Sequence, residues 1–176
     1  TVVIDAAPAD LTIECSDALP TEQPIFSASS CDPVTVTMTE ERVEGSCANN
    51  YTLTRTWVGI DSCGNERVLT QTITVQDTTA PTFVEAVPTD VTVECDAVPT
   101  PAILTAVDSC GEAEVTYNEI REEGSCANNY TLTRTWTATD LCGNTTQHVQ
   151  VITVEDTTGP AFVGTLPASE VYMNCK

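Results

Sequence analysis

Basic residues are scarce in this chain of 176 residues, which has 6 Lys and Arg against 26 Asp and Glu and a net charge of −20 at pH 7. So acidic a surface is repelled by nucleic-acid phosphates and by anionic lipid. Long apolar runs are also missing, and none approaches the roughly 18 residues that a membrane span needs. We therefore expect no nucleic-acid partner and no membrane insertion.

Histidine, the commonest acid–base catalyst, and unpaired cysteine, a common nucleophile, are also scarce. Histidine occurs once, at His148, and aromatic residues make up only 5% of the chain. Hydrophobic residues still make up 41%, which is enough for a packed core, so the acidity does not indicate disorder. We expect a folded protein that is not an enzyme.

The chain contains an internal repeat, which fixes its organisation before any single motif does. The letters GSCANNYTLTRTW occur at 45–57 and, unchanged, at 124–136, and the run Asp-Thr-Thr-x-Pro occurs at 77–81 and at 156–160. We predict a first repeat at 1–80, a second at 81–159 and the first strand of a truncated third repeat at 160–176.

Polar and apolar residues alternate with a period of two, and β-branched Thr and Val fill the alternating runs. In the first repeat this pattern predicts strands at 10–15, 25–30, 34–42, 51–61 and 67–76. Short strands with regular turn signals in a unit of this size are typical of an antiparallel sandwich. The predicted fold class is all-β, with tandem immunoglobulin-like sandwiches.

The alternation in the long strand at 51–61 assigns its inward face. Trp57, and Trp136 at the same place in the second repeat, are predicted core anchors, because large aromatics are usually buried. Arg55 and Arg134 share that face. We expect each arginine to stack on the indole or to pair with a cross-strand glutamate, such as Glu40 in the first repeat and Glu119 in the second.

Each repeat holds four cysteines, and Cys175 is a ninth. No two lie closer than 15 positions apart, which disfavours zinc and favours disulfides formed in an oxidising compartment. The strand between Cys47 and Cys63 has eleven residues and spans about 36 Å, whereas a disulfide needs Cα atoms within about 7 Å. Cys47 and Cys63 are therefore not partners.

Sandwich topology then selects between the remaining pairings. The exit pole is the end of a repeat from which the chain leaves it, and the entry pole is the opposite end. In the first repeat this topology places Cys15, at the end of the first strand, and Cys47, before the long strand, at the exit pole. It places Cys31 and Cys63, in the two other turns, at the entry pole. The predicted disulfides, each adding about 2–4 kcal/mol, are Cys15–Cys47, Cys31–Cys63, Cys95–Cys126 and Cys110–Cys142.

The second repeat resembles a known module, the hyalin repeat (HYR). Residues 134–144 read RTWTATDLCGN, followed by Ile-Thr-Val at 152–154, and the tails at 77–83 and 156–162 resemble the linkers of HYR-like tandem repeats. Such repeats occur in large secreted proteins of Bacteroidota, including gliding-motility adhesins. One departure is that HYR modules usually carry a cysteine on the last strand, where this chain has Leu69 and His148, so their disulfide pattern is not transferred.

The resemblance implies an immunoglobulin-like sandwich, an extracellular or bacterial cell-surface location, and a role as a stiff stalk or filament of an adhesin, with neighbouring repeats of the same chain as partners. Two alternatives stay open. One is a glycan-binding module that acts through avidity. The other is a self-assembling filament subunit in which the strand at 170–175 pairs with a sheet edge on an identical chain.

Aspartates near the repeat boundaries are candidate calcium ligands, since hard cations prefer carboxylate oxygens. In a head-to-tail array the exit pole of one unit faces the entry pole of the next, so four of them are expected to converge there, namely Asp77, Asp90, Asp108 and Asp140. Asp156 with Glu170 would begin a further site. The competing interpretation is that these aspartates cap turns and order the linker.

The linkers also suggest O-glycosylation. Asp77-Thr-Thr and Asp156-Thr-Thr resemble the acceptor pattern used in Bacteroidota, with Thr78 and Thr157 as the modified residues. Plain linker threonine is the alternative.

Overall fold

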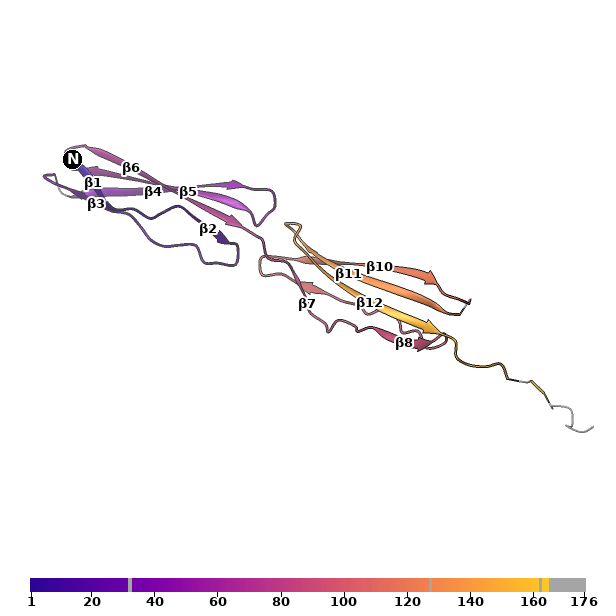
Figure 1. Ribbon diagram of the computed structural model, residues 1–176. Helices are drawn as coiled ribbons and strands as arrows, with labels where there is room; N and C mark the ends of the chain where they lie inside the picture. The colour runs from indigo at the N-terminus through magenta and orange to yellow at the C-terminus, as the bar shows by residue number, and fades with distance from the viewer. Residues whose placement is uncertain (32, 127, 162, 165–176) are drawn as a thin grey trace, which may run out of the picture.

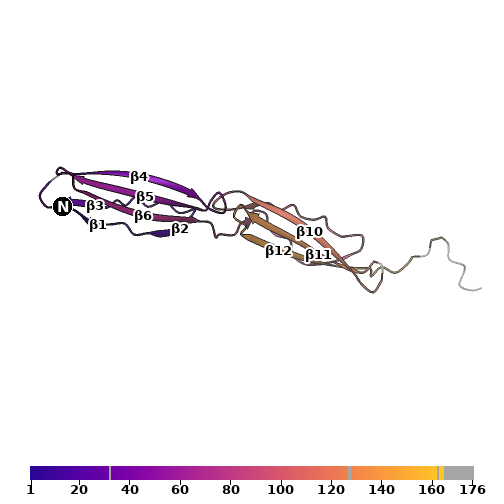
Figure 2. The same ribbon diagram turned by 90° about the horizontal axis from the view of Figure 1, so that it is seen from above.

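The computed structural model describes residues 1–31, 33–126, 128–161 and 163–164, and all its regular elements are strands, as predicted. Those of the first unit are β1 (Val2–Ala6), β2 (Leu11–Glu14), β3 (Ile25–Ala28), β4 (Val34–Glu44), β5 (Tyr51–Asp61) and β6 (Glu66–Gln76). Those of the second unit are β7 (Thr82–Phe83), β8 (Val91–Glu94), β9 (Ala106–Val107), β10 (Ala113–Glu123), β11 (Tyr130–Asp140) and β12 (Thr145–Glu155). The two units lie end to end in an elongated molecule (Figures 1 and 2). Among the described residues no helix is long and apolar enough to cross a membrane.

Each unit contains a four-stranded sheet and a two-stranded sheet. The strand orders are β2-β6-β5-β4 with β1-β3 in the first unit, and β8-β12-β11-β10 with β7-β9 in the second. The expectation of purely antiparallel sheets is wrong for one pair per unit, because β2 runs parallel to β6 and β8 runs parallel to β12. Both strands of such a pair run toward the exit pole, and the rest of the unit supplies the long connection that parallel strands need.

The strand at 51–61 was predicted at its observed bounds, whereas β1 and β7 were not predicted. Both missed strands are short and pair only with another short strand, β3 or β9. The predicted opening strand of a third repeat, including Glu170 and Cys175, falls almost wholly outside the described residues.

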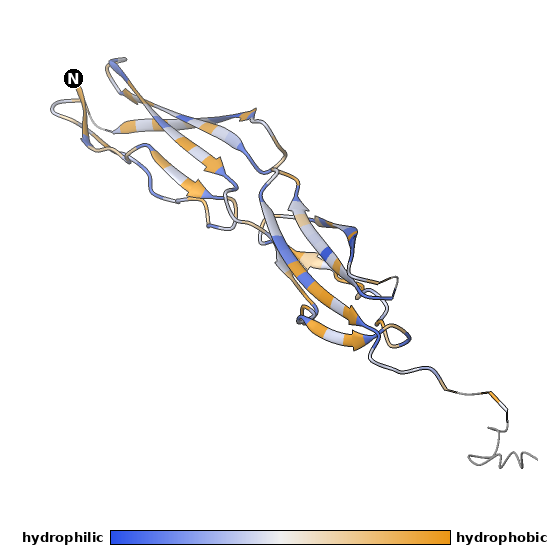
Figure 3. Ribbon diagram, turned by 45° about the vertical axis from the view of Figure 1, so that its right-hand side comes forward, coloured by the Kyte–Doolittle hydropathy of each residue, from blue (hydrophilic) through white to orange (hydrophobic). Residues whose placement is uncertain are grey.

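The core of each unit lies on the inward face of the long strands. Leu53, Ile73 and Val75 form a buried cluster in the first unit, and Leu132, Ile152 and Val154 form one in the second. Figure 3 shows hydrophobic bands, in orange, alternating with paler bands along several strands. Trp57 and Trp136 are 2% and 1% exposed, which confirms them as core residues. The core is thin, so the disulfides supplement a modest apolar burial.

The two arginines on the inward face pair with cross-strand glutamates, as expected. Arg55 Nε donates to Glu40 at 2.9 Å, and Arg134 Nε donates to Glu119 at 2.7 Å. The Arg134 side chain is only 4% exposed and that of Arg55 is 12% exposed. Arg55 also donates to the carbonyl of Pro20 at 2.6 Å.

Glu119→Gln should therefore lower the free energy of unfolding of the second unit by about 1–2 kcal/mol. The substitution removes the negative charge that faces the buried guanidinium of Arg134. The loss is moderate because solvent partly screens Glu119. Urea denaturation measures the loss. Glu40→Gln is the matched control and should cost less, since Arg55 is more exposed and keeps its bond to Pro20.

The same variant predicts a pH dependence. The hydrogen bond from Arg134, followed by that from Tyr117, lowers the pKa of Glu119. A carboxyl group with a lowered folded pKa stabilises the fold above its unfolded pKa, about 4.3, and loses that effect as the pH falls through the folded value. The difference between wild type and Glu119→Gln should be full at pH 7, shrink as the pH falls below about 4.3, and disappear only below the lowered pKa of folded Glu119. Its persistence in acid would contradict the assignment.

Candidate functional site: the junction between the units

The linker leaves the first unit in a conformation fixed by hydrogen bonds. The backbone N–H of Asp77 donates to Asn50 Oδ1 at 2.6 Å, and Thr78 donates to Glu14 through both its N–H, at 3.0 Å, and its hydroxyl, at 2.7 Å. Gly45 closes the adjacent hairpin, where a Cβ would lie 2.6 Å from the carbonyl oxygen of Asn50. The repeated GSCANN sequence thus specifies a turn that grips the linker.

Two disulfides cross this junction. Cys15 is joined to Cys110 with a Cα–Cα distance of 5.7 Å, and Cys47 is joined to Cys142 with a Cα–Cα distance of 5.2 Å. Cys15 follows β2 and Cys47 lies in the β4–β5 hairpin, whereas both partners belong to the second unit. The units are therefore linked covalently at two separate places in addition to the linker.

These bonds correct the predicted pairing. Cys31–Cys63 is present, with a Cα–Cα distance of 5.7 Å, and confirms that prediction. The pairings Cys15–Cys47 and Cys110–Cys142 are wrong, and Cys95 and Cys126 are exposed and free instead of paired. The prediction that Cys15 and Cys47 lie at the exit pole of the first unit, and Cys110 and Cys142 at the entry pole of the second, is correct. The error was to look for partners within one unit, although stacking brings four cysteines together and permits bonds across the boundary.

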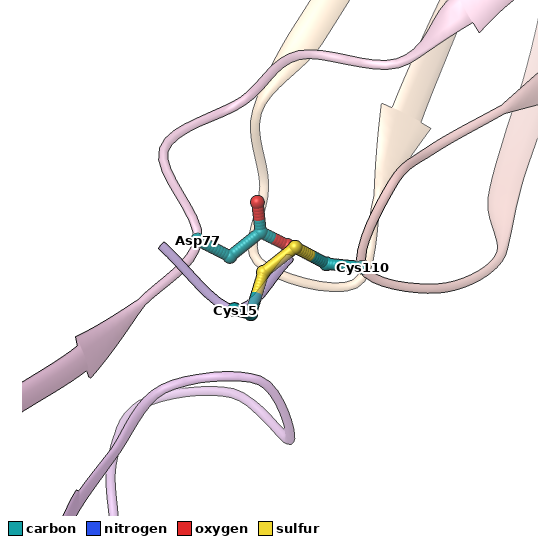
Figure 4. Close-up of side chains that lie close together, drawn as sticks. All are labelled: Cys15, Asp77 and Cys110. Atoms are coloured by element: carbon teal, nitrogen blue, oxygen red, sulfur yellow. A yellow bond between two sulfur atoms is a disulfide. The ribbon is translucent and has the colours of Figure 1, made fainter. Parts of the chain in front are cut away.

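Three aspartate carboxylates meet beside these disulfides. Asp77 from the linker and Asp108 and Asp140 from the second unit each place an oxygen within 4.8 Å of the others. Asp77 also lies against the Cys15–Cys110 disulfide, as Figure 4 shows. Because those two sulfur atoms are bonded to each other, the ligands available to an ion are oxygens.

Hydrogen bonds satisfy these carboxylates unequally. Asp140 accepts from the N–H groups of Cys142 and Asn144 through Oδ1 and from the Asn144 amide through Oδ2. Asp77 is 4% exposed, and its Oδ2 has no partner within the described residues. The same holds for Oδ2 of Asp108, whose Oδ1 accepts from the Cys110 N–H at 2.8 Å. Two buried carboxylate oxygens are thus unpaired in one cluster.

The cluster shifts the ionisation of its members in opposite directions. Burial, and then the charges of Asp108 and Asp140, raise the pKa of Asp77 against its hydrogen bonds from Thr79 and Asn49. Burial also opposes ionisation of Asp140, but hydrogen bonds from Asn144, Cys142 and Gly143 outweigh it and lower the pKa of that carboxyl group. None of the ion pairs among the described residues involves any of the three carboxylates.

The structure brings together three of the four aspartates predicted for this junction. Asp90 is not among them, since it precedes β8 and its carboxylate accepts from the N–H of Val151 at 2.8 Å. The parallel pairing of β8 with the final part of β12 draws it away from the entry pole. Asp156 occupies the corresponding linker position of the second unit, and Glu170 lies outside the described residues.

The predicted glycosylation residues, Thr78 and Thr157, are both exposed. Each hydroxyl donates to a glutamate of its own unit, Glu14 for Thr78 and Glu94 for Thr157. Their modification stays a prediction.

Amide side chains at the junction were not predicted. Asn144 donates to the carbonyl of Asp77 at 3.1 Å across the boundary, and Asn50 holds the Asp77 N–H. Their repetition in the sequence could have indicated them, because Asn50 lies in GSCANN and Asn144 in Cys-Gly-Asn, and both sequences occur in each repeat.

Residues 83–154 match the family described as HYR-like domain with 4 cysteines. This match supports the HYR-like resemblance for the second unit. A search of curated proteins found no match.

Solved structures with some similarity are multi-domain cadherin fragments. Human mucin-like protocadherin EC1-2 has 12% identity and a TM-score of 0.35, over 89% of this chain and 98% of that one. Drosophila N-cadherin EC1-4 has 11% identity and a TM-score of 0.35, over 84% and 48%. The human desmocollin-1 ectodomain has 13% identity and a TM-score of 0.31, over 85% and 39%. Both measures are low, and nothing about the site follows from them.

Proposed function

We propose that this chain is a non-enzymatic, extracellular adhesion-type module whose repeats, at 1–80 and 81–159, form a stiff stalk or filament on a bacterial cell surface. The observation that carries the proposal is the pair of disulfides across the junction. A single linker allows two units to swing, whereas further bonds from Cys15 and from Cys47 restrict bending and rotation.

Three other features support the proposal. The disulfides fit an oxidising, extracellular compartment. The HYR-like match fits a repeat module, and the bacterial setting rests on the resemblance of the linkers. The charge of −20 would keep neighbouring rods apart and soluble.

The two alternative functions lack comparable support. A glycan platform needs exposed aromatic faces, and the partly exposed Tyr117 packs on Trp136 with ring centroids 5.2 Å apart. Charged side chains disfavour strand pairing between chains, and two of the edge strands carry several glutamates, β4 in its second half and β10 at four positions. The stalk is therefore the function that the geometry favours.

Removing both cross-junction disulfides should turn the rod into two hinged units. The variant carries serine at Cys15, Cys110, Cys47 and Cys142. Small-angle X-ray scattering should show a shorter mean length and a broader distribution of inter-unit distances than in wild type, and a protease should cut the linker at 77–82 faster.

Cys31→Ser with Cys63→Ser is the matched control, because it removes a disulfide that lies within one unit. It should leave the scattering curve unchanged while lowering the stability of the first unit by about 2–4 kcal/mol. Scattering of the four-serine variant that matches wild type would show that the disulfides do not stiffen the rod.

A further inference from the structure

We propose that the junction binds one divalent cation, calcium, through the carboxylates of Asp77, Asp108 and Asp140. Their oxygens already lie within 4.8 Å of one another, and they come from the linker, from the residue after β9 and from the end of β11. An ion there would tie the linker to the entry pole. The proposal does not depend on the stalk function.

The second observation is the unpaired oxygen on Asp77. This carboxylate is 4% exposed, and neither its Oδ2 nor that of Asp108 has a partner among the described residues. A buried polar atom without a partner is destabilising and is often explained by an ion or a water. Since none of the ion pairs among the described residues reaches these carboxylates, a cation would supply the missing interaction.

The ligand chemistry selects calcium among divalent ions. All three ligands are hard oxygen donors, and the two neighbouring sulfurs are consumed in the Cys15–Cys110 disulfide. Calcium accepts irregular sets of six to eight oxygens completed by waters, whereas magnesium demands a near-ideal octahedron. A site in an extracellular module should have a Kd on the order of 10⁻⁴–10⁻³ M.

Asp108→Ser tests the site with a substitution that the chain itself contains, because Ser29 occupies the equivalent position of the first repeat. Calorimetric titration of calcium into the chelator-treated, oxidised chain should show one site in wild type and a loss of at least about tenfold in affinity in Asp108→Ser. Calcium should also raise the melting temperature of wild type and not that of the variant.

Asp156→Ser is the control. It removes one charge from the exposed linker of the second unit and should leave binding unchanged. Absence of binding in wild type, or equal binding by Asp108→Ser, would overturn the site. So would several weak sites that vanish in salt, since these indicate diffuse attraction to the acidic surface.

A separate observation concerns the exit pole of the second unit. Cys95 and Cys126 occupy the positions of Cys15 and Cys47, and both are exposed and free. The geometry points to a covalent contact with a following repeat of the same polypeptide, which would carry cysteines at the positions of Cys110 and Cys142. This inference rests on the proposed repeat array.

The second exit pole reproduces the hairpin and linker hydrogen bonds of the first. The N–H of Gly124 donates to the Asn129 carbonyl as Gly45 does to Asn50, and the N–H of Asn129 donates to Cys126 as Asn50 does to Cys47. The linker is held alike, since Asp156 N–H donates to Asn129 Oδ1 at 2.8 Å and Thr157 donates to Glu94. A following unit would thus enter along the same path.

Forming these disulfides requires an oxidant, and a small-molecule disulfide such as oxidised glutathione supplies it. Each new bond joins a thiol of the second unit to a thiol of the following unit, and their two electrons and two protons pass to the glutathione disulfide, which leaves as two glutathione thiols. Exposed cysteines are accessible to this exchange.

The test extends the chain by placing a second copy of residues 81–159 after Gly159, with a protease site inserted in that linker. After oxidation with glutathione and cleavage, the third unit should stay attached on a non-reducing gel and separate on a reducing gel. Cys95→Ser with Cys126→Ser should release it without reductant. Release from the unsubstituted chain, or retention in the variant, would overturn the inference.

A protease site inserted in the linker at 77–81 examines the first junction in the same way. Its units should stay attached after cleavage, through the bonds of Cys15 and Cys47. If the first junction holds and the second does not, the inference fails while the proposed stalk stands. If neither holds, the stalk proposal fails as well.

Discussion

The covalent connection between units is the constraint on which the rest of the structure depends. A linker of a few residues leaves most of the orientational freedom of two small sandwiches intact, and each buried apolar cluster is made of residues of one unit, so neither cluster forms an apolar interface between them. Disulfides at two places, Cys15–Cys110 and Cys47–Cys142, remove that freedom without requiring such an interface. The stiffness of the proposed stalk would thus come from bonds at the pole.

The sheet topology prepares this connection. The parallel pairing of β2 with β6 brings both strands to the exit pole together, where the N–H of Cys15 donates to the carbonyl of Gln76 at 2.8 Å. Cys15 is therefore fixed beside the residue that begins the linker. The β4–β5 hairpin ends at the same pole and supplies Cys47 and the amide that holds Asp77. A purely antiparallel unit would lack the first of these attachments.

Much of the fold was predictable because it is encoded by local alternation. The long strands, the inward tryptophans and the pairing of Arg134 with Glu119 follow from period-two patterning and cross-strand geometry. The disulfide partners were not predictable. The sequence places each cysteine at one pole of its unit, but it does not say which unit supplies the partner where two poles meet. Asp90 was misplaced for a related reason, because only the parallel β8–β12 register shows that it lies beside Val151.

The two chemical features of the junction differ in how far they extend along the chain. Cysteines recur at equivalent positions in both repeats, so a covalent clamp is available at every boundary that such repeats form. The carboxylate cluster does not recur, because the equivalent of Asp108 in the first repeat is Ser29. A cation bound there would therefore reinforce this boundary selectively, whereas cysteines are available at the equivalent positions of both repeats. An array built in this way would have uniform covalent continuity and a stiffness that calcium tunes only where the third carboxylate is present.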